Sequence, residues 1–187
     1  MFNKGLELIE AVYLFDISES AIEVVVHPES ILHSAIAYRD GSVLAQMGEA
    51  DMRTPIAHAL TWPERRVETP VKRLDLVELS NLTFEALDED RFPAVSLARS
   101  AVRHGSGATA VLNCANETAV AAFLGGQCRF SDISWIVEEV LDRFMSGAMA
   151  CQDCNSLDAI MAIQAEANRL CAALIVEAHE QKEEHSA

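Results

Sequence analysis

Positive charge is scarce in this sequence. Its 187 residues include 14 Lys and Arg against 29 Asp and Glu, which gives a formal net charge of −15 at pH 7. Nucleic-acid-binding proteins need Lys and Arg to displace counterions from phosphate, and anionic membrane surfaces attract the same side chains. The composition therefore argues against a nucleic-acid partner and against a membrane partner. The acidic residues are spread along the chain, apart from a tail at residues 177–184 that is typical of a solvated end.

Long apolar runs and disulfide patterns are also missing. We find no apolar run that approaches the ~20 residues of a membrane span. The first fifteen residues carry Glu7 and Glu10 inside their apolar stretch, which is unlike a secretory signal. The five cysteines are an odd number, and their spacing does not suggest a disulfide framework. These absences predict a cytoplasmic protein.

Cys151 and Cys154 form a CxxC pair that could indicate metal or redox chemistry. A zinc site would need a second pair of ligands, and the sequence contains no second CxxC and no HxxxH. A thioredoxin-like site would lie between a strand and a helix in a βαβ unit, which the surrounding pattern does not predict. We interpret the pair as two incidental thiols in a loop that connects helices.

Hydrophobic periodicity divides the chain into three segments. Residues 1–62 mix a helix with strands, residues 63–92 are a proline-punctuated connector with little regular structure, and residues 93–187 are helical. The predicted fold class is α+β, with a helix and short antiparallel strands followed by a linker and a C-terminal four-helix bundle. Trp62 and Trp135 are interpreted as core residues.

The first segment begins with a helix expected over Phe2–Phe15. Strands are expected at Glu23–Val26, Leu32–Tyr38 and Val43–Met47. Asp40-Gly41 predicts a two-residue type I′ hairpin turn with positive φ at both positions. A short helix is expected at Thr54–Thr61, with Pro55 at its first position, where the missing N–H costs nothing.

The last segment shows four helical patterns. The first begins at Pro93, and the second runs from about Asn113 to Leu124 and stops at Gly125-Gly126. The third has Ser131 as its N-cap and a clear 3.6-residue period. The fourth begins near Asn155, which together with Asp158 has a spacing similar to a capping box.

The candidate functional residues lie on the first helix. At 100° per residue, Asn3, Lys4 and Glu7 share an arc of roughly 100° between two apolar stripes. We therefore expect a mostly buried helix whose polar arc faces a cleft or a satisfied polar network. An amide, an ammonium and a carboxylate could orient, neutralise and ligate an anionic, metal-bound substrate. A simpler alternative stays open on the residues alone: Lys4 and Glu7 form an i,i+3 ion pair on a solvated face, worth ~0.2–0.5 kcal/mol.

A longer series of motifs begins with Asn3-Lys4-Gly5-Leu6-Glu7. It continues through Ile9-Glu10-Ala11, Leu14-Phe15, His27-Pro28-Glu29-Ser30, Leu32-His33-Ser34, Asp40-Gly41-Ser42, Gln46, Gly48-Glu49, Asp51-Met52-Arg53-Thr54-Pro55-Ile56-Ala57, Leu79 to Phe84, Leu112-Asn113 and Ala115-Asn116-Glu117. In this ordered series the chain resembles the C-terminal half of the 1-deoxy-D-xylulose 5-phosphate reductoisomerases, up to about residue 145.

The resemblance implies an NADPH-dependent enzyme of the non-mevalonate isoprenoid pathway. Such enzymes rearrange 1-deoxy-D-xylulose 5-phosphate and reduce the product to 2-C-methyl-D-erythritol 4-phosphate. By resemblance, Asn3 and Lys4 hold the substrate phosphate and nearby oxygens, and Glu7 ligates a divalent Mg or Mn that acts as a Lewis acid. Residues 1–62 become the end of the catalytic and dimerisation domain, so a homodimer is expected. His33 and Met52 border the active site in matching stretches, although a hydrogen-bonded core histidine and a packing methionine are the alternatives.

The sequence departs from the family pattern in what it does not contain. A complete member begins with a dinucleotide-binding Rossmann domain, and its glycine-rich turn is missing here, since Gly105-Ser106-Gly107 is expected to be a loop between helices. The family's other two metal ligands and its mobile lid also precede the matching segment. One carboxylate cannot hold Mg²⁺ or Mn²⁺ well without further ligands. We therefore expect a fragment that starts inside a longer gene or is a truncated copy, without an NADPH site and without turnover of its own. The alternative function is a non-catalytic, self-associating remnant.

Overall fold

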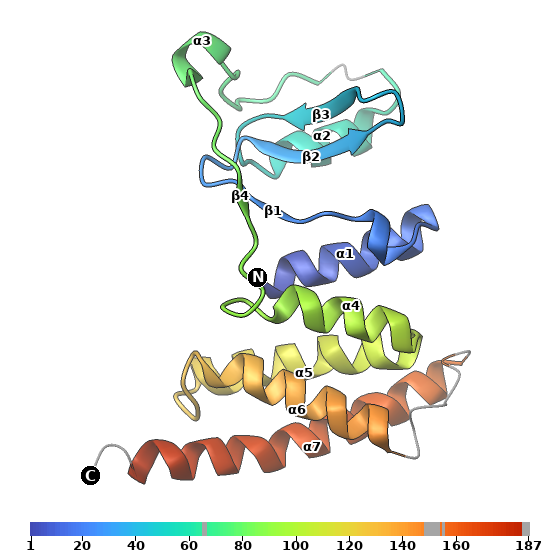
Figure 1. Ribbon diagram of the computed structural model, residues 1–187, viewed down its shortest axis with the longest axis vertical. Coiled ribbons are helices and arrows are strands. Elements are labelled where there is room, and N and C mark those ends of the chain that lie inside the picture. The colour runs from blue at the N-terminus through green and yellow to red at the C-terminus, as the bar shows by residue number, and fades with distance from the viewer. Residues whose placement is uncertain (65–66, 148–153, 155, 185–187) are drawn as a thin grey trace. The chain divides into compact units, whose positions relative to one another are not determined.

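The computed structural model describes residues 1–64, 67–147, 154 and 156–184 (Figure 1). It is mostly helical, with a few short antiparallel strands, as the predicted α+β class requires. The chain forms two compact units: Met1–Glu23 with Asp88–Ala187, and Val24–Leu87. This grouping differs from the predicted segments, because the first helix belongs with the C-terminal helices and most of the connector, up to Leu87, belongs with the strands.

The helical unit contains five α-helices in its described residues. They are α1 (Phe2–Phe15), α4 (Ala94–His104), α5 (Ser106–Leu124), α6 (Asp132–Ser146) and α7 (Leu157–Glu184), and a short 3₁₀ turn, η1 (Glu19–Ala21), follows α1. Helix α1 packs on α4 and α5, while α5 also packs on α6 and α7 (Figure 1). The largest buried side chains come from α4 to α7 and include Leu112, Ile136, Leu141, Ile163 and Leu174. Because α1 joins the other helices, a bundle of four helices alone stays a prediction.

The start of α5 is the largest error among the predicted helix boundaries. The helix begins at Ser106 instead of near Asn113, so Ser106 and Gly107 are helical and only Gly105 separates α4 from α5. Gly105 has φ 99°, and its N–H donates to the carbonyls of Ala101 and Val102, which closes α4 in a conformation that suits glycine. A single residue in this conformation ends one helix and starts the next, so the predicted three-residue loop is wrong.

Helix α7 also corrects an expectation. Its stretch Leu157–His179 is long and apolar enough to cross a membrane by length and composition, although the sequence was expected to contain no such run. One stripe of this helix is buried in the same core as α5 and α6, and Glu166 and Arg169 form an ion pair in its middle. Charged side chains at that position are costly in a bilayer. We therefore describe α7 as a helix of the core.

In its described residues, the strand unit contains two antiparallel pairs of strands. Strand β1 (Val25–Val26) pairs with β4 (Glu85–Ala86), and β2 (Leu32–Ala37) pairs with β3 (Val43–Met47). The unit also contains α2 (Arg53–Thr61) and α3 (Leu76–Leu79). The connector was predicted to have little regular structure, but α3 and β4 lie within it. A strand of two residues is too short to show an alternating pattern, and β1, with which it pairs, is far away in the sequence.

The turn of the β2–β3 hairpin is not type I′. Gly41 has φ 88°, whereas Asp40 is not among the residues of positive φ. The N–H of Tyr38 donates to the carbonyl of Ser42 at 2.8 Å, and the N–H of Gly41 donates to the carbonyl of Tyr38 at 3.0 Å. This pattern is a three-residue loop that ends in a glycine, another common hairpin geometry. The carboxylate of Asp40 fixes the loop by accepting from the N–H of Ser42 at 2.9 Å.

The two tryptophans differ in burial. Trp135 is partly buried against the helical core, as expected. Trp62 is 70% exposed and meets His58 edge to face at 5.3 Å between ring centroids, so its assignment to the core is wrong. Trp62 is the C-cap residue of α2.

Candidate functional site

Lys4 and Glu7 form an ion pair on the outer face of α1. Their Nζ and Oε2 atoms are 2.7 Å apart, and their side chains are 54% and 55% exposed. Asn3 is exposed on the same face. The structure therefore brings the three candidate residues to one accessible surface, and the ion pair is the contact that the simpler alternative predicts.

The remainder of α1 is less buried than expected. Gly5, Leu8 and Ile9 are buried, because they lie on the side that packs against the other helices. Toward the end of the helix, Tyr13 is 56% exposed and Phe15 is 70% exposed. Both apolar stripes are therefore packed in the first part of α1, where Leu8 and Ile9 represent one stripe each, and both are exposed at its end. The prediction of a mostly buried helix is wrong for the last turn.

Glu7 has the right chemistry for one metal ligand but lacks companions here. Its carboxylate is a hard oxygen donor of the kind that Mg²⁺ prefers. Among the described residues, no group of three or more His, Cys, Asp or Glu side chains could hold a metal ion. This donor set therefore does not form a complete metal site by itself.

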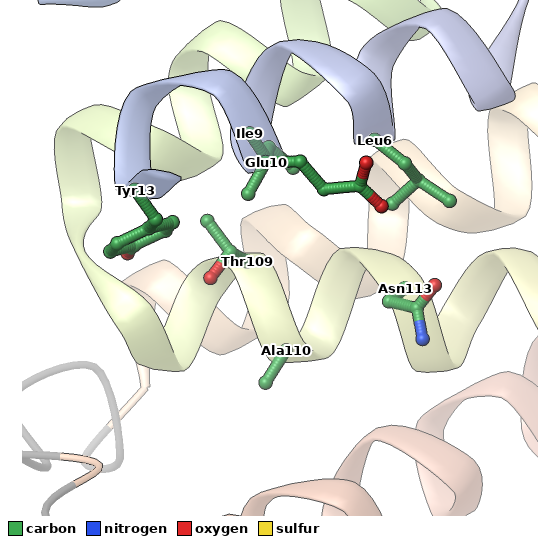
Figure 2. Close-up of a pocket in the computed structure, with 7 residues that line it drawn as sticks. All are labelled: Leu6, Ile9, Glu10, Tyr13, Thr109, Ala110 and Asn113. Carbon is green, nitrogen blue, oxygen red and sulfur yellow. The ribbon is translucent and has the colours of Figure 1, made fainter. Parts of the chain in front are cut away.

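A shallow groove of about 390 Å³ runs along the flank of α1 beside α5. Figure 2 shows Leu6, Ile9, Glu10 and Tyr13 of α1 on one side, and Thr109, Ala110 and Asn113 of α5 on the other. None of the three candidate residues lines this groove. It adjoins their helix without containing them.

The strand unit has its own cavity, with a volume of about 720 Å³. His33 and Met52, the two residues that the resemblance places beside an active site, both line it. His33 is exposed and its Nε2 lies 3.1 Å from the carbonyl oxygen of Gly48, so it is hydrogen-bonded but not a core residue. His58, for which the sequence suggested no role, also lines the cavity, and its Nδ1 is buried with no hydrogen-bond partner among the described residues.

Asp51 also lines this cavity and forms a local ion pair with Arg53. The Nε of Arg53 donates to Oδ1 of Asp51 at 2.9 Å, and so does the backbone N–H of Arg53. Hydrogen bonds from the guanidinium of Arg53 lower the pKa of Asp51 to about 2. The sequence displayed both residues in one motif, but a two-residue spacing gives no sign that the side chains would pair.

His27 is another histidine without an assigned role in the sequence. Its ring is stacked on Phe84 with centroids 4.7 Å apart, and its Nδ1 lies 2.7 Å from the carbonyl oxygen of Thr83. Glu29 accepts from the N–H of Thr83 at 3.1 Å. Hydrogen bonding with the side chain of Thr83 is the main reason that the pKa of Glu29 is below its usual value. These contacts hold Thr83 and Phe84, which precede β4, against the residues that follow β1.

The cysteines show no assembled redox site in the described part of the chain. Cys151 lies outside the described residues, so the interpretation of the CxxC pair stays a prediction. Cys114 and Cys171 are buried free thiols of α5 and α7. Burial raises the pKa of Cys171 to about 12, which makes its thiol a poor nucleophile at neutral pH.

Comparison with known proteins decides the family. The family model described as DXP reductoisomerase C-terminal domain matches residues 47–170. The chain belongs to the 1-deoxy-D-xylulose 5-phosphate reductoisomerase family.

Individual reductoisomerases match nearly the whole chain. The enzyme of Pseudomonas fluorescens strain Pf0-1 is 54% identical over 170 residues, which are 91% of this chain and 41% of that protein. The solved reductoisomerase from Zymomonas mobilis in complex with NADPH has a TM-score of 0.84 and 48% identity, over 94% of this chain and 45% of its own. A reductoisomerase structure in complex with NADPH, fosmidomycin and magnesium has a TM-score of 0.89 and 46% identity, over 94% and 44%. The chain thus spans about two fifths of the length of the curated reductoisomerases that it matches.

Proposed function

We propose that this chain is the C-terminal portion of a reductoisomerase that converts 1-deoxy-D-xylulose 5-phosphate to 2-C-methyl-D-erythritol 4-phosphate with NADPH. The observation that carries the proposal is the accessible Asn3–Lys4–Glu7 face in a chain 54% identical to a reductoisomerase over 170 residues. Related enzymes have been solved with NADPH and with magnesium, which is the chemistry that the proposal assigns to the complete enzyme.

In this proposal each residue of the face has its own task. The ammonium of Lys4 neutralises the substrate phosphate, and the amide of Asn3 donates to it or to a neighbouring oxygen. Glu7 contributes one carboxylate ligand to a divalent cation, Mg²⁺ or Mn²⁺, which supplies Lewis-acid chemistry when bound. The exposed ion pair is then the resting arrangement: Lys4 and Glu7 satisfy each other until an anion and a cation separate them.

The proposal includes a dependence on residues outside this chain. A single carboxylate is a weak ligand set for Mg²⁺, and the sequence contains no glycine-rich dinucleotide motif. We therefore expect the 187 residues alone to be inactive. The cytoplasm is the proposed location.

Self-association is proposed as well. Both strands of the β2–β3 hairpin are exposed over most of their length, and the side chains of Ile36, Val43 and Leu44 are 58%, 63% and 63% exposed. Apolar strands of this kind usually need a covering surface. These residues support a homodimer through the hairpin, and they equally support the second candidate function, a self-associating module without catalysis.

Turnover separates the two functions. The chain would be joined to the part of the Pseudomonas fluorescens reductoisomerase that precedes the matched region, and NADPH oxidation would be followed with the deoxyxylulose phosphate and Mg²⁺. We expect turnover by this fusion protein and none by the chain alone. An inactive but folded fusion protein that still self-associates would support the non-catalytic module instead.

A further inference from the structure

Gly5 occupies an unusual position for a glycine, in the first half of the helix that carries the candidate face. Glycine is among the poorest helix formers, because its backbone loses more conformational freedom on folding than that of other residues. Its φ is not in the left-handed region, so the backbone of α1 does not require glycine here. The residue is buried, which indicates that packing is the reason for it.

The packing partner of Gly5 is the backbone of α4. A Cβ atom added to Gly5 would lie 2.9 Å from the carbonyl oxygen of Ala94 and 3.0 Å from the Cβ of Ala98. Real Cβ atoms essentially never come within 3.0 Å of a neighbour, so the contact with the carbonyl oxygen of Ala94 is not tolerated. Figure 1 shows α1 lying along α4, and the contact side of α4 is built from small buried residues, with Ala94 2% exposed and Ala98 0% exposed. The two helices therefore approach as closely as their backbones allow.

The position of the candidate face depends on this approach. Asn3 and Lys4 precede Gly5, and Glu7 follows it within the same turn. The three side chains of the face therefore move together with the α1 backbone. The obstacle at 2.9 Å is a backbone carbonyl inside a helix, which cannot rotate away as a flexible side chain could. Reaching an ordinary contact of 3.4 Å or more requires α1 to move outward by several tenths of an ångström. Misplacement on this scale matters because reacting groups must be held to about 0.5 Å.

We propose that Gly5 is a positioning residue: it seats α1 against Ala94 and Ala98 of α4, and this contact holds Asn3, Lys4 and Glu7 at the distance from which they reach substrate and metal. The proposal rests on the function proposed above and deepens it. It assigns the helical unit a part in substrate binding, since α4 sets the place of the face although it contributes none of its side chains.

The test uses the fusion protein with Gly5→Ala, assayed well below its unfolding temperature. We expect kcat/KM for the deoxyxylulose phosphate to fall at least about tenfold with a raised KM for that substrate, because the face is displaced. The KM for NADPH should not change. Gly107→Ala is the matched control, because a Cβ at this buried helical glycine would meet side-chain atoms of Phe144, Cys154 and Ile163 at 3.4–3.5 Å, an ordinary contact distance. Its kinetics should equal those of the unsubstituted fusion protein.

A second variant covers the case in which Gly5→Ala does not fold. Ala98→Ser adds an atom to the same contact from the α4 side and leaves the α1 sequence intact, so it should raise the same KM. A lower unfolding temperature with unchanged kinetic constants in the folded variants would overturn the proposal and leave Gly5 a packing residue. The function itself would still stand in that case, whereas absence of turnover by the unsubstituted fusion protein would overturn both.

Discussion

At the scale of single residues, the proposed function depends on three side chains of α1. Their spacing in the sequence is compatible with a binding face and with a solvated ion pair. Helical periodicity correctly placed Asn3, Lys4 and Glu7 on one face. The same spacing is expected for a solvated ion pair and for a binding surface. The structure also fits both, because a 2.7 Å contact between half-exposed side chains occurs in either case. A solvated Lys4–Glu7 pair would affect only stability, whereas a binding face would affect activity. Measuring both properties therefore separates the two alternatives.

Replacing Lys4 by Met should leave stability nearly unchanged while it removes activity. An exposed i,i+3 pair contributes only ~0.2–0.5 kcal/mol, so urea unfolding of the chain should shift by no more than that. In the fusion protein we expect kcat/KM to fall by about 100-fold or more. Lys72→Met is the control, since Lys72 also forms an exposed ion pair, with Glu78 at 3.4 Å. Equal activity of the two variants would favour the solvated pair.

Asp51 gives a pH dependence whose sign is fixed. Its pKa is about 2 in the folded chain, against an ordinary value of 3.8, because Arg53 hydrogen-bonds to the charged form. The unfolded state therefore binds more protons between these values, so this stabilisation is complete above about pH 4 and is lost as the pH falls toward 2. Asp51→Asn should flatten the fall of the unfolding temperature in this window. An unchanged acid profile would show that the pair does not form in solution.

Among the helices and strands, the sequence predicts the elements that depend on a continuous local pattern. It does not predict those that depend on distant residues or on the conformation of one residue. Helix α1, strands β2 and β3, and the third C-terminal helix follow from apolar periodicity along a continuous stretch. Strand β4 exists only because β1 pairs with it from about sixty residues away. The early start of α5 depends on the conformation of Gly105, and a glycine in a sequence does not reveal its φ.

Helix α7 is long and apolar enough to cross a membrane, but we describe it as a helix of the core. One pair of variants tests this assignment. Leu174 is 1% exposed and Val176, two residues later, is 59% exposed. Leu174→Ala should lower the free energy of unfolding by about 2–5 kcal/mol, as for other buried leucines. Val176→Ala should change it by less than about 0.5 kcal/mol. Similar small effects of both variants in urea unfolding would mean that α7 is not packed in the core.

For the whole molecule, the ordered series of motifs indicates the family, whereas the grouping of the helices and strands into compact units is not visible in the sequence. The helix that bears the candidate face and the cavity with His33 and Met52 belong to different compact units. Sequence patterns could not show that α1 packs with the C-terminal helices, because nearly eighty residues separate it from α4. Nor could they show His58 at the cavity wall, since an isolated histidine has no pattern of its own.

Self-association of the chain should depend on the hairpin. Leu44→Glu places a charge on the exposed apolar strand β3 and should convert a dimer to a monomer in light scattering across a concentration series. Leu60→Glu is the control, because Leu60 of α2 is 81% exposed in the same unit and is not part of the hairpin. A dimer that survives Leu44→Glu, or equal effects of both variants, would place the contact elsewhere.

The central claim is that the exposed face of α1 belongs to a reductoisomerase active site. Its most direct test is the rate of NADPH oxidation by the fusion protein as Mg²⁺ is titrated, with Glu7→Gln compared with Glu10→Gln on the same helix. We predict that Glu7→Gln requires a much higher Mg²⁺ concentration and loses about 100-fold or more in kcat, while Glu10→Gln retains both values. Identical Mg²⁺ dependence and identical kcat in the two variants would contradict the claim.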